Sequence, residues 1–197
     1  MTDIQEGKGK LQFWDAVWDL RIAECPCDVQ FLDWLDHEQI RGSSIFHFGT
    51  GSHHIIGIQT AENGSGNCVL GITAAPKEYD AFVELAIERP QVEKTYKVFF
   101  GDIYQLEGRL LPDFDVVTLF HLCEFRTEQS DQYGAMTDRQ LLDLLTAKTR
   151  PGGYLLFYTK SFAFDAAEKI LQGWEQEGAV EKVGLYELLL VYRKKSA

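Results

Sequence analysis

The feature that most constrains the fold is the segment 43–57, where an apolar, aromatic run ends in the turn Gly49-Thr50-Gly51 and a helix is expected to begin at once. A strand, a glycine turn and a helix in this order form the first part of a dinucleotide-type βαβ unit. Glycine lacks a Cβ atom, so the backbone can turn tightly and approach a ligand. A Gly-x-Gly pair alone is common in loops and is weak evidence for a βαβ unit. The segments that follow it along the chain provide the stronger evidence.

Four further apolar runs are spaced like the strands of a parallel sheet. They span residues 68–73, 96–100, 114–120 and 153–159. Apolar residues recur at helical spacing in the connecting segments, over residues 52–60, 76–88, 164–177 and the stretch that follows Thr137. Strands that alternate with helices predict an α/β fold.

The last two apolar runs, residues 179–183 and 185–192, are separated only near Gly184. A parallel crossover needs about a dozen residues or more. The two runs are therefore expected to form an antiparallel hairpin.

The ordered set resembles the class I S-adenosylmethionine-dependent methyltransferases over residues 43–193. The resemblance is carried by the Gly-Thr-Gly turn, the pair Gly101-Asp102, the run that begins at Asp115, and Pro-Gly-Gly at 151–153. It implies a three-layer, doubly wound, mostly parallel sheet of about seven strands with a C-terminal antiparallel hairpin and N-terminal helices. The expected organisation is an N-terminal helical segment, 1–42, and a methyltransferase-like domain, 43–197.

The same resemblance implies S-adenosylmethionine as the cofactor. The residues at the matching positions are Phe48, Gly49, Thr50, Gly51, Thr73, Ala74, Asp102, Ile103 and Phe120. Asp102 would accept a hydrogen bond from the adenine amino group, although capping of the turn after Gly101 explains this residue equally well. His121 lies at the position that faces the reacting methyl group.

The sequence departs from the family pattern at two places. Ile45 and His47 stand where the family usually has an acidic residue and a glycine, and Thr73 stands where an acidic residue usually binds both ribose hydroxyls. A charged acceptor contributes about 1.5–3 kcal/mol per hydrogen bond, so losing it weakens binding. Glu62 and Glu78 are the acidic residues considered as replacements.

The N-terminal segment shows helical spacing over residues 11–22 and again after Cys25-Pro26-Cys27, where Asp28 is expected to cap a second helix. The resemblance implies that this segment covers the cofactor or shapes the substrate pocket. The alternative is that its aromatic residues only pack the helices onto the sheet.

Four of the five histidines are expected at the carboxyl ends of the first and fourth strands: His47, His53, His54 and His121. Histidine titrates near neutrality, so His121 is a candidate general base. A second interpretation is a metal site of His53 or His54 with His121 and Glu124. A third is that His47 and His53 hydrogen-bond to the backbone.

Composition narrows the classes of partner. The net charge is −11, from 19 Lys and Arg against 30 Asp and Glu, which argues against nucleic acid. No apolar run reaches the roughly 18 residues of a membrane span, and no signal peptide is evident, so the cytoplasm is expected. The four cysteines are interpreted as reduced structural residues, because Cys-x-Cys is not the spacing of a zinc knuckle.

The leading hypothesis is methyl transfer to an O or N atom of a small molecule, with a homodimer as an option. The rival is a non-catalytic or repurposed protein that keeps the scaffold and binds a partner or ligand. A Rossmann oxidoreductase is disfavoured because His54 replaces the third glycine of Gly-x-Gly-x-x-Gly.

Overall fold

The computed structural model describes residues 15 and 17–196, and a seven-stranded sheet forms its centre. The strands are β1 (Ser44–Phe48), β2 (Cys68–Thr73), β3 (Tyr96–Phe100), β4 (Phe114–Thr118), β5 (Thr149–Tyr158), β6 (Val180–Tyr186) and β7 (Leu189–Lys194). Their order is β3-β2-β1-β4-β5-β7-β6. Strands β1 to β5 run parallel, and β7 is antiparallel to both of its neighbours. The predicted sheet is confirmed.

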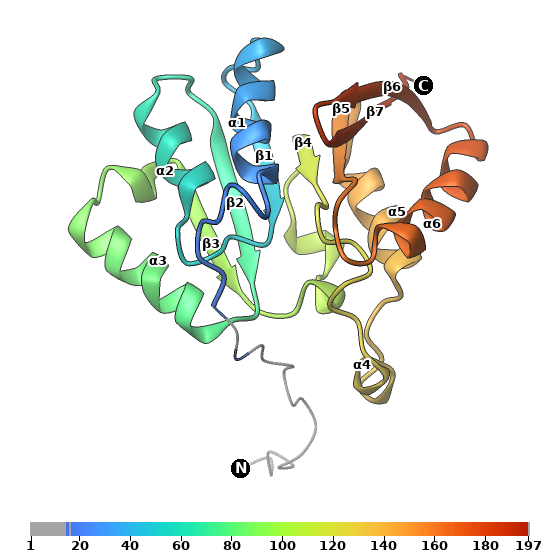
Figure 1. Ribbon diagram of the computed structural model, residues 1–197, viewed down its shortest axis with the longest axis horizontal. Coiled ribbons are helices and arrows are strands. Elements are labelled where there is room, and N and C mark those ends of the chain that lie inside the picture. Colours follow the sequence, from blue (N-terminus) through green and yellow to red (C-terminus); the bar gives the residue numbers. More distant parts are fainter. Residues whose placement is uncertain (1–14, 16, 197) are drawn as a thin grey trace.

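Helices cover both faces of this sheet (Figure 1). The described residues form α1 (Cys27–His37), α2 (Ile55–Glu62), α3 (Pro76–Glu88), α4 (Glu128–Gln132), α5 (Asp138–Lys148), α6 (Phe164–Gln176) and the 3₁₀ turns η1 (Val92–Lys94), η2 (Ile103–Gln105) and η3 (Gly108–Leu110). Phe31 of α1, Ile56 of α2 and Phe82 of α3 belong to one hydrophobic cluster. Leu141 of α5 and Leu171 of α6 belong to another. The fold therefore has the three predicted layers.

The strands are apolar along both faces because each face is covered. In β1, Ile45 joins the cluster beneath α1 and α2, whereas Phe46 joins the cluster beneath α5 and α6. Successive side chains of a strand point to opposite faces, so continuous burial requires apolar residues at every position.

Local signals set several helix starts as expected. Pro76 occupies the first turn of α3, where its missing N–H has no partner to lose. Thr137 caps α5, and its Oγ1 accepts a hydrogen bond from the Gln140 N–H at 3.2 Å.

The N-terminal segment differs from its prediction. Residues 17–22 are not helical, and residues 11–14 and 16 of the predicted helix lie outside the described part of the chain. Pro26, not Asp28, is the N-cap of α1, and Asp28 is buried in the first turn. Trp34 of α1 shares a core with Ile45 of β1, so this helix is part of the main body. The division at residues 42 and 43 stays a prediction.

The hairpin is present, but its turn is not at Gly184. β6 continues to Tyr186, and Gly184 lies at an irregularity in the pairing of β6 with β7. Glu187, with a φ of 50°, lies in the turn itself. Cys68, expected to be reduced, is a free thiol exposed at the start of β2.

The strand order reverses direction at β1. From β1 the chain continues to β2 and β3 on one side, and then returns to β4 on the other side of β1, so that the connections cover opposite faces of the sheet. A crevice forms beyond the carboxyl ends of strands at such a point, where open α/β sheets bind ligands. In the described residues, no helix combines the length and apolar character needed to cross a membrane.

Candidate functional site

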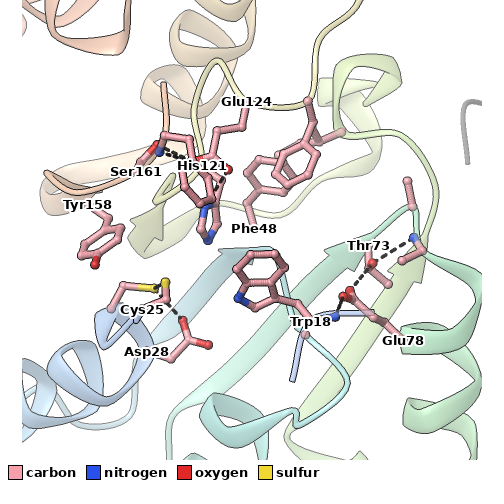
Figure 2. Close-up of a pocket in the computed structure, with 18 of the residues that line it drawn as sticks. Trp18, Cys25, Asp28, Phe48, Thr73, Glu78, His121, Glu124, Tyr158 and Ser161 are labelled. Atoms are coloured by element: carbon pink, nitrogen blue, oxygen red, sulfur yellow. Dashed lines mark hydrogen bonds and ion pairs between the residues drawn. The ribbon is translucent and has the colours of Figure 1, made fainter. Parts of the chain in front are cut away.

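A cavity of about 530 Å³ opens at the carboxyl ends of the parallel strands (Figure 2). Phe48 of β1, Thr73 of β2 and Tyr158 of β5 line it, together with Asp102 after β3 and His121 after β4. Small-molecule sites typically have volumes of roughly 300–1,000 Å³. The cavity therefore has the position and size of a ligand site.

Most of the residues singled out from the sequence meet in this cavity. Its lining includes Phe48, Gly49, Gly51, Thr73, Ala74, Asp102, Ile103 and His121. Thr50 and Phe120 are not part of the lining. Both are about 1% exposed, and the Phe120 ring packs on Phe31 of α1 with centroids 5.8 Å apart. These two side chains belong to the core.

Residues 17–25, here called the N-terminal strap, form one wall of the cavity. The Trp18 carbonyl accepts a hydrogen bond from the Ser52 N–H at 2.9 Å. A Cβ atom at Gly51 would lie 2.9 Å from this carbonyl oxygen and 2.5 Å from the His53 ring. The space that Gly51 leaves is therefore filled by the protein's own strap and by His53.

A carboxylate is present at the end of β2 although the sequence has Thr73 there. The Thr73 hydroxyl donates to Glu78 Oε2 at 2.7 Å, and the Trp18 N–H donates to Glu78 Oε1 at 3.2 Å. Glu78 lines the cavity from the first turn of α3 and is 7% exposed. Glu62, the other candidate, pairs with Arg89 at 3.2 Å outside the cavity lining. Burial raises the pKa of Glu78, and the Thr73 hydroxyl opposes this rise.

Asp102 performs the capping role that its position suggested. Its Oδ1 accepts a hydrogen bond from the Tyr104 N–H at 2.9 Å, which caps η2. Its Oδ2 accepts one from the Tyr133 hydroxyl at 2.8 Å. Asp102 and Ile103 both line the cavity, so an adenine contact remains a prediction that is compatible with the cap.

Two of the four histidines belong to the interior. His47 Nδ1 pairs with the Thr118 hydroxyl at 2.8 Å. His54, at a φ of 46°, pairs through Nδ1 with the Tyr96 hydroxyl and through Nε2 with the Glu78 carbonyl, both at 2.8 Å. Burial lowers the pKa of His47 to about 3 and that of His54 to about 4. These imidazoles are neutral and do not fill the cavity.

His53 makes a backbone contact, as one interpretation predicted. Its Nδ1 accepts a hydrogen bond from the Ile55 N–H at 3.3 Å, and its Nε2 lies 3.6 Å from an Asp28 oxygen. The set of His53 or His54 with His121 and Glu124 does not assemble as a metal site in the described residues.

His121 forms a dyad with Glu124. His121 Nδ1 lies 3.1 Å from Glu124 Oε2. The second Glu124 oxygen accepts hydrogen bonds from the Ser161 hydroxyl at 2.5 Å and the Phe162 N–H at 2.9 Å. Burial by itself would lower the pKa of His121, but the hydrogen bond and charge of Glu124 outweigh it and raise this pKa. The dyad leaves Nε2 of the imidazole for other partners.

Two cysteines of the strap and α1 complete this end of the cavity. Cys25 Sγ lies 3.4 Å from Cys27 Sγ, and both line the cavity with free thiols. A hydrogen bond from Cys27 lowers the pKa of Cys25 to about 6, and the same contact with burial raises the pKa of Cys27. Neither residue was predicted from the sequence to belong to a site, because their spacing matched no known ligand motif and their third neighbour, His121, is remote in sequence.

Comparison with known proteins bears on the scaffold. No family model matches the sequence, and no curated protein matches it. The structure matches an O-methyltransferase from Bacillus cereus in complex with SAH, with a TM-score of 0.61, 19% identity and coverage of 92% of this chain and 84% of that one. It also matches the precorrin-6y C5,15-methyltransferase of Geobacter metallireducens, with a TM-score of 0.58, 13% identity and 94% coverage of both chains. The chain has the class I methyltransferase fold.

Identities this low show the fold alone. A putative S-adenosyl-L-methionine-dependent methyltransferase from Methanococcus maripaludis gives a TM-score of 0.62 at 9% identity, with coverage of 86% and 84%. The chain spans between 35% and 56% of the length of three other matched chains. The class I methyltransferase fold accounts for the sheet order and the place of the cavity, while the activity has to be argued from the site.

Proposed function

We propose that this chain transfers the methyl group of S-adenosylmethionine to an O or N atom of a small molecule. The observation that carries the proposal is a cavity with two chemically different ends. One end holds the carboxylates of Glu78 and Asp102, and the other holds the His121–Glu124 dyad. A nucleoside cofactor and a nucleophile need such different surroundings.

The residues at the first end fit the adenosyl part of the cofactor. Glu78 Oε1 and Oε2 each accept one hydrogen bond from the protein, and each carboxylate oxygen has a second acceptor position. Glu78 can therefore accept from ribose hydroxyls in place of the carboxylate that the sequence lacks at Thr73. Ile103 and Phe48 supply apolar surface for a purine ring.

The residues at the second end fit an acceptor. When bound, the cofactor supplies a methyl group that its sulfonium makes electrophilic. His121 presents Nε2 as a proton acceptor, while Glu124 holds the ring and stabilises its charged form. Methyl transfer depends strongly on positioning and on exclusion of water, which the strap assists as a wall of the cavity.

One observation favours the rival, a scaffold that binds without methyl transfer. The Trp18 N–H and the Thr73 hydroxyl already hold the Glu78 carboxylate. If the ribose hydroxyls cannot share these two carboxylate oxygens, the cofactor cannot bind in the cavity, and the strap permanently blocks the ribose position.

Cofactor binding separates the two candidates. S-Adenosylhomocysteine at 100 times its Kd should stabilise the fold by about 2.7 kcal/mol, which raises the Tm by about 5–11 °C for a chain of this size. Scanning calorimetry with S-adenosylhomocysteine, and with NAD as the comparison ligand, measures this shift. No shift at millimolar S-adenosylhomocysteine would favour the non-catalytic rival. Transfer of a labelled methyl group to a panel of phenols, alcohols and amines then tests the activity.

The wider setting is also part of the proposal. We infer a small-molecule substrate, no nucleic acid or membrane partner and a cytoplasmic location, on the basis of the acidic composition and the absence of long apolar runs in the sequence. A homodimer is the assembly to test by sedimentation velocity.

A further inference from the structure

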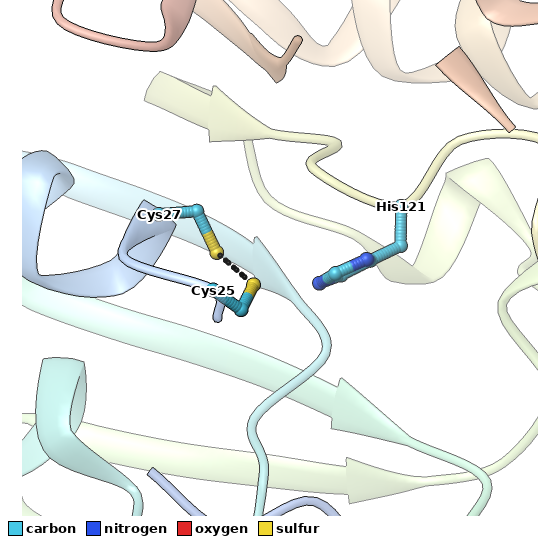
Figure 3. A group of neighbouring side chains, drawn as sticks. All are labelled: Cys25, Cys27 and His121. Atoms are coloured by element: carbon cyan, nitrogen blue, oxygen red, sulfur yellow. Dashed lines mark hydrogen bonds between the residues drawn. The ribbon is translucent and has the colours of Figure 1, made fainter. Parts of the chain in front are cut away.

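Three side chains with metal-binding atoms converge at the acceptor end of the cavity (Figure 3). They are Cys25 in the strap, Cys27 at the start of α1 and His121 after β4. Their ligand atoms all lie within 4.8 Å of one another, and the two sulfur atoms are 3.4 Å apart. Figure 3 shows both sulfur atoms on the side of the His121 ring tip.

The chemistry of this set matches zinc. Two thiolates and one imidazole are the protein ligands of a type of catalytic zinc site whose fourth position stays open. With Zn–S of about 2.3 Å and Zn–N of about 2.0–2.1 Å, tetrahedral geometry needs ligand atoms about 3.5–3.8 Å apart. The sulfur atoms, 3.4 Å apart, are about 0.4 Å closer than this geometry needs, and separations of at most 4.8 Å to the imidazole exceed it by about 1.3 Å or less, which side-chain rotation can supply.

The surroundings of the imidazole match a metal ligand as well. A metal-bound histidine usually donates its other N–H to a carboxylate, which fixes the tautomer and the ring orientation. His121 Nδ1 is paired with Glu124, so Nε2 is the atom that faces the sulfurs. Glu124 is itself fixed by Ser161 and the Phe162 N–H. The outer ring of contacts that a metal ligand needs is therefore already in place.

Two alternatives to a zinc site, a disulfide between the two cysteines and burial of the thiols as small apolar groups, explain fewer of these observations. A disulfide has an S–S distance of about 2.05 Å, well below the separation observed between Cys25 and Cys27. Burial of small apolar residues suits Cys27, which is 2% exposed, but all three residues line the cavity, and Cys25 is only partly buried. Pro26 between the cysteines restricts the backbone, which limits the entropy lost when both thiols bind one ion.

We propose that Cys25, Cys27 and His121 bind a zinc ion whose fourth coordination position is open to the cavity. This inference rests on the proposed function and deepens it, because that position suits the hydroxyl oxygen of an alcohol or phenol acceptor. The oxygen binds the ion, its O–H bond breaks and the proton goes to water, since zinc lowers the pKa of bound O–H groups. His121 then acts as a ligand and the ion replaces it as the group that activates the acceptor.

Metal content of the intact chain tests the site. The protein, reduced and then equilibrated with zinc sulfate and desalted, should hold one zinc per chain by plasma mass spectrometry. Cobalt(II) substitution should give a thiolate-to-metal charge-transfer band. Cys25→Ser, Cys27→Ser and His121→Ala should each lose at least tenfold in zinc affinity. Cys68→Ser is the matched control, because Cys68 is exposed at the start of β2, and should retain both signals.

A further variant distinguishes a ligand site from a general loss of folding. Glu124→Gln keeps the size of the side chain, and replacing a carboxylate that orients a metal-bound histidine typically lowers metal affinity by about 10- to 100-fold. Circular dichroism and urea unfolding of each variant without zinc check that the chain still folds. Less than 0.2 zinc per chain in the folded, reduced protein would overturn the proposal, as would zinc binding that Cys25→Ser and Cys27→Ser leave unchanged.

The zinc site and the methyltransferase activity can fail separately. Zinc bound by the three residues without any S-adenosylhomocysteine shift would keep the site and remove its link to methyl transfer. Methyl transfer that persists in zinc-free Cys25→Ser and Cys27→Ser but is lost in His121→Ala, with the S-adenosylhomocysteine shift kept in all three variants, would overturn the role of zinc and leave His121 as a direct base.

Discussion

At the scale of single residues, the histidines of this protein have two opposite environments. His54 is buried beside Tyr96 and the Glu78 carbonyl, and burial lowers its pKa to about 4. His121 is paired with Glu124, and its pKa is raised even though burial opposes this. Residues of the same type thus lie as a neutral part of the core and as a carboxylate-paired group in the cavity lining.

The lowered pKa of His54 predicts acid sensitivity. Unfolded histidine has a pKa of about 6.5, so the unfolded chain gains a proton as the pH falls from about 6.5 to about 4 while the folded chain does not. Stability supplied by neutral His54 is present above about pH 6.5 and is lost in this window. Urea unfolding at pH 7 and pH 4.5 should show that His54→Gln removes about 2–3 kcal/mol of the pH-dependent loss. The exposed His37→Gln is the control, and equal pH dependence in His54→Gln and wild type would contradict the assignment.

Glu78 is predicted to bind the cofactor's ribose. Glu78→Gln preserves the shape of the side chain but removes the charge, and a charged hydrogen bond contributes about 1.5–3 kcal/mol. We expect the Kd for S-adenosylhomocysteine in titration calorimetry to rise by about 10- to 100-fold. Glu62→Gln is the matched control, because Glu62 pairs with Arg89 outside the cavity lining. If both variants bind alike, Glu78 has no part in binding.

At the scale of elements, a glycine allows α2 to lie against the sheet. A Cβ atom at Gly57 of α2 would lie 2.2–2.4 Å from three ring carbons of Tyr96, which is buried in β3. The Tyr96 hydroxyl also holds His54 at the start of the same helix. The close approach therefore positions the turn between β1 and α2, which borders the cavity.

Two helical glycines give a matched test of this packing. Gly57→Ala should destabilise the fold by about 1–3 kcal/mol, because the ring of Tyr96 has to move in a close-packed core. Gly173→Ala in α6 should stabilise it by about 0.5–1 kcal/mol, since a Cβ there meets nothing within 4 Å and alanine favours the helix. Urea unfolding measures both. Changes in the free energy of unfolding of the same sign for both variants would show that the contact with Tyr96 does not determine how well a side chain is tolerated at Gly57.

The strap shows how an element can be held without regular structure. Residues 17–21 are neither helix nor strand, yet the Trp18 backbone bonds both Ser52 beyond the glycine turn and Glu78 of α3. These contacts join three segments around the mouth of the cavity. Cys25 belongs to the strap, and the strap is hydrogen-bonded through Trp18 to Glu78, the carboxylate that is proposed to bind ribose. A change at Glu78 is therefore expected to affect the position of Cys25.

At the scale of the whole molecule, the charge predicts which partners are excluded. A net charge of −11 repels a phosphate backbone, and affinity for nucleic acid comes chiefly from neutralised phosphates. Gel-shift experiments with duplex DNA and with single-stranded RNA at about 0.15 M salt should show no binding up to about 10 µM protein. A complex that forms below about 1 µM and weakens with added salt would reveal a basic surface that the composition hides.

The sequence predicted the scaffold well because the signals for it are local. Apolar runs bounded by Thr73, Gly101 and Pro151 marked strands, Pro76 marked a helix start, and the short connection near residue 184 required an antiparallel pair. Each depends on the chain within a few residues. The misplaced turn at Gly184 and the part of the predicted helix that covers residues 17–22 are errors of the same local reasoning. In the strap, tertiary contacts take the place of helical hydrogen bonds.

The sequence also placed most of the predicted site residues in the cavity, because the carboxyl ends of parallel strands share one edge. It could not show that Thr73 holds the carboxylate of Glu78, that Thr50 and Phe120 face the core, or that Cys25 and Cys27 meet His121. Those relations depend on side chains that are brought together by the order of the strands and by the path of the strap. Distances across a folded sheet follow from packing, whereas sequence patterns record only neighbours along the chain.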